Sequence, residues 1–492
     1  MYQRFLICIA LLASGSVGAS PLTLDTTFGS GTGKASTALG LQSNGTSGMV
    51  RQSSGKLVLA ASCVGSSLYN FCLTRFDVDG NLDTSFGNAG KVIASIGSSQ
   101  AVVNAVALDS TDRIVVAGRC SLPTAGFCVA RFNANGALDT SFGSGGAVGT
   151  TIVGSADEAF ALAITSTGRI VLAGSCTPVN DRAICVSRYL TDGSLDLTFN
   201  AAAPNPADRG KVITNVGDGM AYAVNTLADQ RVVVAGYCRN AVMDTAFCAL
   251  RYNEDGTADN SFGTAGKSLL SLAPVGNMSA GTAATLQPDG KLVIVGFCYS
   301  GTDDDFCVAR LNTDGTPDAT FNGTGSVRTP IGDARDGPAA VTLQADGRIV
   351  VAGYCYRTAN DADICAARYN ANGTLDTSFN RVGKIVTHLS DANESASAVL
   401  VQPDGKILIG GACNDTAVNV CAIRYSVPCS LDIDGDGAIL ATTDALLFAR
   451  ISLGLTGSAV IAGVNFPETA TRKTWTAIRE HLVAQCGMSI AQ

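Results

Sequence analysis

The sequence predicts an all-β seven-bladed propeller of four-stranded blades, closed by the N-terminal strand and followed by a small α-helical calcium-loop domain. Three observations lead to this expectation. Seven cysteine pairs recur at a nearly constant period within a chain of 492 residues. Turns that contain glycine and aspartate divide each repeat into four strand-like segments. Finally, the two ends of the repeat region carry complementary parts of one repeat.

Residues 1–19 have the pattern of a secretory signal peptide. Arg4 precedes a short apolar stretch, and Val17-Gly18-Ala19 forms a small-residue cleavage pattern. The apolar stretch is too short to span a bilayer, and no longer one follows it. We therefore expect cleavage after Ala19, no transmembrane segment, and a secreted, extracellular or periplasmic protein; an uncleaved anchor is the alternative.

The composition favours many short buried strands joined by tight turns. Hydrophobic residues make up 46% of the chain, charged residues 15%, and 55 residues are glycine, a combination that argues against disorder. The formal net charge is −8, and no basic stripe is present that could displace counterions from phosphates. We therefore exclude a nucleic-acid partner, and we expect a monomer.

One repeat shows how the four strands are expected to follow one another. Residues 159–164 form an alternating segment, and residues 169–176 are apolar on both faces, as a strand between two neighbours must be. A third segment follows at 185–189, and residues 210–214 provide the fourth. Four short strands joined by such turns are typical of a propeller blade.

Removal of Cys8 with the signal peptide leaves 16 cysteines, an even number in an exported chain. We predict eight disulfides: seven that staple the hairpin of the second and third strands, where directly opposite residues lie within disulfide reach, and one that joins the ends of the C-terminal segment. Zinc binding is the alternative, but the two cysteines of each pair stand too far apart in sequence for it, and His388 and His481 do not recur with the pairs. The predicted pairs are Cys63–Cys72, Cys120–Cys128, Cys176–Cys185, Cys238–Cys248, Cys298–Cys307, Cys355–Cys365, Cys413–Cys421 and Cys429–Cys486.

The ends of the repeat region predict a closed ring. Residues 24–29 are the tail of a repeat without its beginning, whereas the last repeat, which ends near Tyr425, lacks its tail. The N-terminal strand should therefore complete the seventh blade and leave no free sheet edge. An open stack of repeats is the alternative, but such stacks usually need atypical capping repeats.

An arginine three residues after the second cysteine and an aspartate eight residues after that arginine recur along the repeats. A guanidinium can hold a carboxylate through two hydrogen bonds, so we expect structural clamps rather than catalytic or calcium-binding groups, because sevenfold repetition marks a scaffold. The expected pairs are Arg75–Asp83, Arg131–Asp139, Arg188–Asp196, Arg251–Asp259, Arg310–Asp318, Arg368–Asp376 and, across the closure, Arg424–Asp25.

The repeat resembles the delta-60 repeat family of exported bacterial proteins. The resemblance rests on Asp-Gly-Arg-Ile-Val-Val-Ala-Gly at 346–353 and on Ala-Arg-Tyr-Asn-Ala-Asn-Gly-Thr-Leu-Asp-Thr-Ser-Phe at 367–379, and it covers residues 24 to about 425. It implies a propeller-like β architecture on a secreted or cell-surface protein, and it brings no catalytic residues. The hairpin cysteines depart from the commoner repeat and indicate an oxidising setting.

The repeat pattern ends at residue 428, and the C-terminal segment begins with a sequence similar to the calcium loops of EF-hands and dockerins. Asp432, Asp434 and Asp436 occupy loop positions 1, 3 and 5, and Ala438 offers a backbone carbonyl at position 7. The last carboxylate, Asp444, comes one residue later than the motif requires. We therefore expect calcium as the cofactor of this segment, held in a bulged loop.

Two helices are expected after the loop, over residues 444–453 and 469–485. We divide the mature chain into a propeller at 20–428 and a dockerin- or EF-hand-like domain at 429–492. Because a second acidic loop is missing, a structural cap or attachment domain is favoured over a cohesin-binding dockerin.

The loops between the second and third strands differ from blade to blade and meet the loops between blades at one propeller face. Two adjacent loops are acidic and offer a possible ligand face for cations or a basic partner, although a solvated rim explains them as well; they contain Asp303, Asp304, Asp305, Asp361 and Asp363. We expect a non-catalytic secreted or cell-surface binding scaffold for a polysaccharide or protein ligand. The alternatives are a carbohydrate-active hydrolase or lyase that uses paired carboxylates, and a structural envelope component.

Overall fold

The computed structural model describes residues 22–40, 42–65, 68–98, 100–154, 156–178, 180–239, 244–274, 276–358, 361–414, 418–426, 433–434, 440, 442–484 and 490. The predicted signal peptide, Cys429, Cys486, Asp432, Asp436 and Ala438 lie outside these residues. No helix in the described part of the chain has the length and hydropathy that a bilayer span requires.

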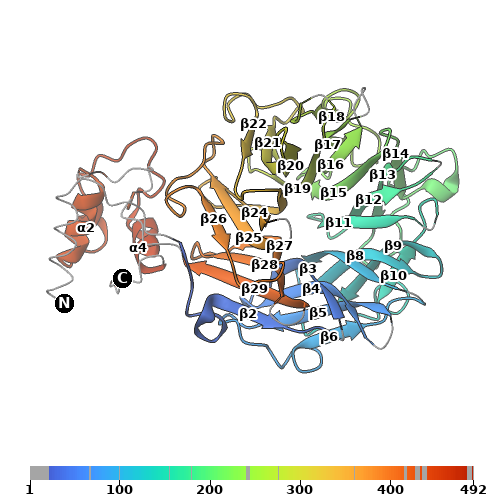
Figure 1. Cartoon of the computed structure of the whole chain (residues 1–492), viewed down its shortest axis with the longest axis horizontal. Helices are drawn as coiled ribbons and strands as arrows, with labels where there is room; N and C mark the ends of the chain where they lie inside the picture. The colour runs from blue at the N-terminus through green and yellow to red at the C-terminus, as the bar shows by residue number, and fades with distance from the viewer. Residues whose placement is uncertain are drawn as a thin grey trace.

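Seven antiparallel sheets stand around a common centre, and this confirms the predicted all-β propeller of seven four-stranded blades (Figure 1). Blades 1 to 3 consist of β3 (Gln42–Arg51), β4 (Leu57–Val64), β5 (Tyr69–Phe76) and β6 (Lys91–Ala94); β7 (Val102–Leu108), β8 (Ile114–Ser121), β9 (Ala125–Phe132) and β10 (Ala147–Thr150); and β11 (Glu158–Ile164), β12 (Ile170–Cys176), β13 (Ala183–Tyr189) and β14 (Lys211–Thr214).

Blades 4 to 6 repeat this order from the inside outward. They consist of β15 (Gly219–Thr226), β16 (Val232–Arg239), β17 (Thr245–Tyr252) and β18 (Lys267–Leu270); β19 (Ser279–Leu286), β20 (Leu292–Tyr299), β21 (Asp304–Leu311) and β22 (Ser326–Thr329); and β23 (Asp336–Leu343), β24 (Ile349–Thr358), β25 (Asp361–Tyr369) and β26 (Lys384–Thr387). Two short helical turns, Gly29–Gly33 and Pro206–Asp208, lie in the connections.

The N-terminal strands complete blade 7, as the complementary ends of the chain predict. This blade contains β27 (Ser395–Val401), β28 (Ile407–Asn414) and β29 (Val418–Ser426). Its outer position is shared by two short strands, β1 (Thr23–Leu24) and β2 (Lys34–Thr37), which both pair with β29 and bring this sheet to five strands. Lys34 lies opposite Ile423, and Thr37 lies opposite Val420. The first and last strands of the repeat region are therefore hydrogen-bonded neighbours, and the ring is closed.

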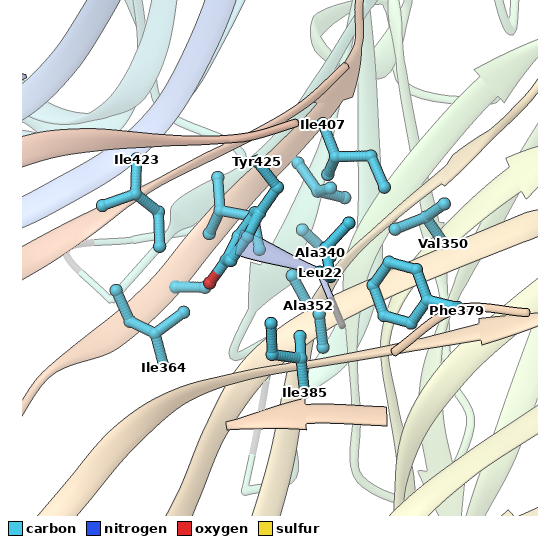
Figure 2. Packing of buried hydrophobic residues seen from close by; sticks show 14 of the residues in the cluster. Leu22, Ala340, Val350, Ala352, Ile364, Phe379, Ile385, Ile407, Ile423 and Tyr425 are labelled. Atoms are coloured by element: carbon cyan, nitrogen blue, oxygen red, sulfur yellow. The ribbon is translucent and has the colours of Figure 1, made fainter. Parts of the chain in front are cut away.

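The hydrophobic core is divided into seven similar clusters, each between two neighbouring blades. Figure 2 shows the cluster between blades 6 and 7, where Phe379, Ile364 and Val350 of blade 6 face Tyr425 and Ile407 of blade 7. The second and third strands are buried along nearly their whole length, for example in β12 and β13. This burial explains why those segments are apolar on both faces.

All seven predicted hairpin disulfides are present, with Cα–Cα distances between 5.4 and 5.9 Å. The expectation that the paired cysteines lie directly opposite one another is wrong. Cys176 lies opposite Ala183, and Cys185 lies opposite Gly174, so the bond runs diagonally across the hairpin. The residue opposite the second cysteine is glycine in most blades because a side chain there would collide with the inner strand: a Cβ on Gly174 would lie 2.0 Å from the Glu158 carbonyl oxygen.

The described residues after the propeller contain three helices: α2 (Asp444–Ser452), α3 (Ser458–Ile461) and α4 (Trp475–Ala484). In Figure 1, α2 and α4 lie outside the ring of blades. Together with Ile433 they bury a small separate core that includes Leu447, Ile451, Ile478 and Leu482.

The last helix begins at Trp475, later than the sequence suggests. The backbone N–H of Arg472 donates to Asp434 O (2.7 Å), and its Nε donates to Ile433 O (2.9 Å), so this segment is held against the loop rather than in a helix. Thr474 then caps α4, because its Oγ1 accepts from the backbone N–H of Ala477 (3.3 Å).

Candidate ligand-binding face

The two faces of the ring differ in kind. We call one the clamp face: it is formed by the turns between the third and fourth strands, such as residues 190–194, and it repeats closely from blade to blade. We call the other the staple face: it is formed by the loops between the second and third strands, such as 180–182, and by the loops between blades, such as 215–218. Gly219 N donates to Arg182 O (3.1 Å), and Glu394 N donates to Ala362 O (2.7 Å), so these two sets of loops do meet.

The clamp face carries a ring of seven arginine–aspartate pairs. In each pair Nε of the arginine donates to one aspartate Oδ2 at 2.6 to 2.8 Å, and this includes Arg424 with Asp25 across the closure. A lysine or arginine from the turn before the second strand reaches the same oxygen, such as Lys291 Nζ on Asp318 (2.9 Å). Every one of these carboxylates thus lies between two cations.

The expectation that each guanidinium binds its carboxylate through two hydrogen bonds is wrong, because only Nε donates to the aspartate. In Arg310, Nη2 donates to Thr320 Oγ1 (3.0 Å) and Nη1 donates to the Ala371 carbonyl of the next blade. The same guanidinium lies over the Phe321 ring, 4.8 Å from its centroid. Because one arginine binds its own blade and the next, the clamp joins neighbouring blades and its charged groups are engaged in the scaffold.

Burial alone would raise the pKa of Asp318, but hydrogen bonds from Lys291 and Thr320 and the charge of Arg310 hold that pKa below its usual range. The same balance lowers the pKa of Asp25. These carboxylates are therefore ionised at any physiological pH, which suits a scaffold and not a general acid.

The acidic loops of blades 5 and 6 lie on the staple face, and most of their carboxylates face a cation. Asp304 pairs with Arg335 (3.1 Å), and Asp305 lies 3.6 Å from Arg328. Asp303 accepts instead from the hydroxyl groups of Ser300 (2.8 Å) and Thr302 (3.0 Å). These three residues thus form a mixed-charge rim.

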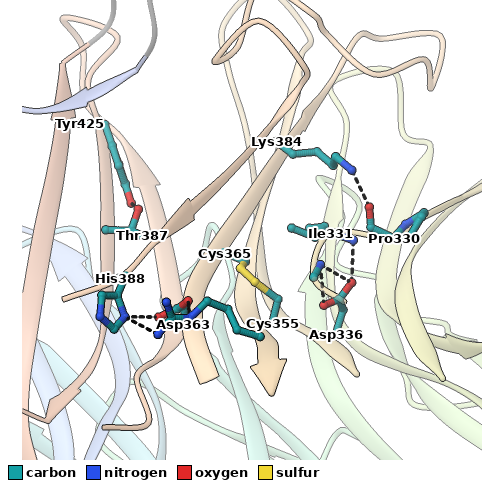
Figure 3. Close-up of a disulfide and its surroundings, with 12 residues drawn as sticks. Pro330, Ile331, Asp336, Cys355, Asp363, Cys365, Lys384, Thr387, His388 and Tyr425 are labelled. Atoms are coloured by element: carbon teal, nitrogen blue, oxygen red, sulfur yellow. Dashed lines mark hydrogen bonds and ion pairs between the residues drawn. A yellow bond between two sulfur atoms is a disulfide. The ribbon is translucent and has the colours of Figure 1, made fainter. Parts of the chain in front are cut away.

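In blade 6, Asp361 and Asp363 meet two residues that the sequence did not connect with them, Arg357 and His388. His388 Nδ1 lies 2.9 Å from Asp363 Oδ1, next to the Cys355–Cys365 disulfide (Figure 3). The hydrogen bond to Asp363 raises the pKa of His388. The His388 side chain is exposed, but it belongs to a cluster with both acids.

Asp336 is the first residue of β23, directly after the loop between blades 5 and 6 and beside the acidic rim, and it is 1% exposed. Its carboxylate accepts hydrogen bonds from the backbone N–H groups of Ile331 (2.7 Å) and Gly332 (3.1 Å), as Figure 3 shows. Burial, opposed by these hydrogen bonds and reinforced by Asp305 and Asp303, raises the pKa of Asp336 to about 6.

The raised pKa of Asp336 predicts a pH-dependent stability. Since the folded protein holds this proton more tightly than the unfolded chain, Asp336 stabilises the fold below pH 4, and this contribution is lost as the pH rises to 6 and above. We expect the difference in melting temperature between the wild type and Asp336→Asn to change between pH 4.5 and pH 7, in favour of the wild type at the lower pH. A constant difference in thermal denaturation across this range would contradict the assignment.

Aromatic side chains gather on the staple face and towards the centre of the ring, and the sequence analysis missed them. Every inner strand contains a β-bulge at the same place in its repeat, for example between Ala159 and Ala161. The bulged residues, from blade 1 to blade 7, are Ser47, Asn104, Phe160, Tyr222, Thr282, Ala339 and Ser397.

The bulged residues of blades 3 and 4 break the symmetry of this ring. Thr282 Oγ1 donates to the Pro338 carbonyl of the next blade, and Asn104 Nδ2 donates to the Ala159 carbonyl (2.9 Å), so these polar residues join inner strands. Phe160 and Tyr222 instead pack their rings against each other at a tilt of 47°, with ring centroids 5.2 Å apart. Both rings are half-buried.

Further aromatic rings lie at the staple ends of the second strands of blades 4 and 6. The ring of Tyr237, at the staple end of β16, has its centroid 6.3 Å from that of Tyr222. The Arg182 guanidinium lies over the Tyr237 ring, with its Cζ 6.0 Å from the ring centroid. Tyr354, which occupies the same position in blade 6, packs edge-on against Tyr356 (5.7 Å). A comparison of the residues just before the first cysteine of each pair would have revealed them, because that position is aromatic only in blades 4 to 6.

A separate groove of about 660 Å³ lies on the outside of blades 2 and 3, away from these residues. Its lining includes Leu122, Val148 and Leu195 together with glycines and serines, and its charged residue is Asp192. Such a lining supplies little specific recognition, so the staple face is the better candidate site.

In the C-terminal segment, the described residues place Asp434 and Asp444 in contact, both 1% exposed or less. Asp444 Oδ1 accepts the backbone N–H groups of Ile433 and Asp434 (3.0 Å), and Oδ2 accepts that of Leu440 (2.8 Å). Asp444 thus closes the loop by holding its backbone on both sides.

Comparison with known proteins addresses the fold. Six segments match the family model described as a domain of unknown function (DUF5122) β-propeller, at residues 52–86, 110–142, 165–199, 227–262, 287–321 and 344–379. No curated protein matches the chain.

Several solved structures are similar at low identity. An ulvan lyase, a polysaccharide lyase bound to a saccharide, is 10% identical over 80% of this chain and 97% of its own, with a TM-score of 0.45. Drosophila Semaphorin 2a is 10% identical over 82% and 76%, with a TM-score of 0.47, and a protein from Lactobacillus plantarum is 14% identical over 77% and 94%, with a TM-score of 0.42. The six family matches, together with the closed ring of seven blades, support a β-propeller repeat family for these repeats.

Proposed function

We propose that this protein is an exported, non-catalytic binding scaffold whose staple face holds a polysaccharide. The observation that carries the proposal is the half-buried aromatic surface of Phe160, Tyr222 and Tyr237, with a second aromatic pair, Tyr354 and Tyr356, in blade 6. These aromatic residues occur at positions where the other blades have different residues. A purely structural role would not require such differences between blades.

The chemistry of this surface suits a sugar chain. Tyrosine offers an apolar ring face and a polar hydroxyl at a low entropic cost, which matches the alternation of C–H faces and hydroxyl groups on a pyranose. Arg182, held by Asp218 at 2.8 Å, adds a fixed hydrogen-bond donor beside the rings. The surface extends over several blades, so an extended chain fits it better than a single small molecule.

Two features support a non-catalytic role at an extracellular location. On the staple face, Asp218, Asp304 and Asp363 each pair with an arginine, which suits positioning better than proton transfer. Seven disulfides indicate an oxidising compartment, and they are in keeping with export through a signal peptide cleaved after Ala19.

The test is binding of residues 20–492 to a panel of neutral and acidic polysaccharides, with assay of the same mixtures for released products. We expect Phe160→Ala combined with Tyr222→Ala to weaken binding at least tenfold, because both stacking surfaces are lost. Leu197→Ala, which removes a 57% exposed apolar side chain on the clamp face, is the matched control and should leave binding unchanged. Released products would overturn the non-catalytic assignment, and unchanged binding by the double variant would overturn the assignment of the aromatic surface.

For residues 429–492 we propose a calcium-stabilised cap or attachment domain. Asp432, Asp434, Asp436, the Ala438 carbonyl and Asp444 would supply the oxygen ligands, and the support is the burial of Asp434 and Asp444 beside a loop that Asp444 already closes.

Calcium should stabilise this C-terminal segment. At a concentration 100 times the dissociation constant the gain would be about 2.7 kcal/mol. Calorimetry should therefore show one transition that shifts upward with calcium and back with chelator, while the propeller transition stays in place. Asp434→Asn should abolish the shift, and a wild-type profile that is insensitive to chelator would contradict the proposal.

A further inference from the structure

We propose that Asp361, Asp363 and His388, at the rim of blade 6, form a binding site for one divalent transition-metal ion of the zinc type. The site is separate from the proposed calcium loop and from the aromatic surface. Two carboxylates and one imidazole are a ligand set that suits zinc, whereas calcium prefers oxygen ligands alone.

Regular secondary structure places the three side chains together. Asp361 and Asp363 belong to β25, and His388 directly follows β26. Ile364 lies opposite Thr387 in the pairing of these strands, so the residues just before and just after them, Asp363 and His388, become neighbours. The Cys355–Cys365 disulfide fixes the hairpin from the other side.

The distances fit a single ion after small side-chain movements. One ligand atom from each of the three residues can be chosen so that all lie within 4.8 Å of one another. Zinc holds such ligands at roughly 2.0 to 2.2 Å, so two ligands of one ion are no more than about 4.4 Å apart.

Two buried carboxylate oxygens of this cluster lack hydrogen bonds from the described residues. The Asp363 side chain is 0% exposed, and its Oδ2 is ion-paired with Arg357 but accepts no hydrogen bond. The buried Oδ1 of Asp361, whose side chain is 21% exposed, also accepts none. Buried carboxylate oxygens are usually satisfied, because leaving them without partners costs free energy. Within the described part of the chain, the charge is balanced by Arg357, whose Nε lies 3.0 Å from Asp363 Oδ2 and whose Nη2 pairs with Asp361.

Arg357 cannot satisfy His388 at the same time. His388 Nδ1 lies 2.9 Å from Asp363 Oδ1, which requires Nδ1 to carry a proton, and 3.2 Å from Arg357 Nη2, which requires Nδ1 to offer its lone pair. One nitrogen cannot do both. A metal ion in place of the guanidinium would take the lone pair and both carboxylates together. The Arg357 side chain is 45% exposed and can turn towards solvent.

The other nitrogen of the imidazole lies near a carboxylate, one of the partners, with backbone carbonyls and waters, that this nitrogen usually has in metal sites. His388 Nε2 lies 3.6 Å from Asp391 Oδ1. A carboxylate there favours the tautomer that is protonated at Nε2, and this leaves the lone pair on Nδ1, the nitrogen that faces the two acids.

Among the described residues, blade 6 alone combines these three ligands. The position of Asp363 is occupied in blade 5 by Asp305, but the residue that corresponds to His388 is Pro330. The histidine is thus a departure from the repeat at the place where it can complete a metal site. Blade 5 provides a matched acidic loop without a site.

The test is isothermal titration of the full mature protein with Zn²⁺ after chelator treatment, repeated with saturating Ca²⁺ so that the C-terminal loop is occupied. We expect one Zn²⁺ site that calcium does not displace. His388→Ala should weaken zinc binding at least tenfold, while Asp304→Asn in the matched loop of blade 5 should leave it unchanged. Melting temperatures would establish that each variant is folded.

Arg357→Ala is the most discriminating variant. If the guanidinium occupies the place of the ion, its removal should tighten zinc binding several-fold, whereas a structural role in an ion-pair network would predict only lower stability. Absence of zinc binding by the wild type, equal affinity in His388→Ala, or weaker affinity in Arg357→Ala would each overturn the proposal. Because these titrations contain no polysaccharide, their outcome is independent of the proposed glycan function.

Discussion

A mature chain that begins at residue 40 instead of residue 20 is expected to lose most of the stability of its propeller. The deletion removes β1 and β2 and exposes the backbone of β29 as an open edge. It also removes Phe28, which is fully buried, and leaves the buried Arg424 without Asp25. Losing a buried phenylalanine costs about 3 to 5 kcal/mol, and breaking a buried ion pair costs about as much again.

Together these losses amount to about 6 kcal/mol or more, a large share of the ~5 to 15 kcal/mol that stabilises a typical protein. Urea unfolding and size-exclusion chromatography would measure the result as a lower midpoint and as association through the open edge. A chain that ends at residue 426 is the control, because it loses a larger part of the protein, residues 427–492, but keeps the ring closed. A truncated N-terminus with the wild-type midpoint would contradict closure as a source of stability.

Arg310→Ala is expected to lower the free energy of unfolding by about 3 kcal/mol, the low end of the range for a broken buried ion pair. Arg310 joins Asp318 and Thr320 of blade 5 to the Ala371 carbonyl of blade 6 and covers Phe321. Lys291 still pairs with Asp318 in the variant, so the carboxylate keeps one cation, and this limits the loss.

The measurement is chemical denaturation of Arg310→Ala beside Arg328→Ala. Arg328 belongs to the same blade, but its side chain is 49% exposed and its nearest carboxylate is 3.6 Å away, so its removal should cost no more than about 0.5 kcal/mol. Arg310→Lys should recover less than half of the loss, because lysine keeps the charge but cannot reach three partners. Equal effects of Arg310→Ala and Arg328→Ala would show that the clamp does not join the blades.

The sequence determined the repeat, the number of blades, the closure and the seven hairpin disulfides. These features follow from local patterns that occur seven times, so chance matches at any one repeat are averaged out. It did not give the diagonal course of the disulfides, because strand register depends on the bulge in the inner strand and on the glycine packed against it. Nor did it give the three partners of each arginine, since one of them belongs to the next blade.

Only the tertiary structure decided the staple face. Phe160 and Tyr222 belong to different repeats of the chain, but their rings pack against each other across two inner strands. His388 reaches Asp363 because β25 and β26 are paired. The scaffold could be read from the sequence because identical contacts repeat in every blade, and repetition is visible along the chain. The candidate sites are made by residues that differ between blades. A residue that occurs in one blade gives no recurring sequence signal, so its partners cannot be predicted from the sequence and are determined only when the ring folds.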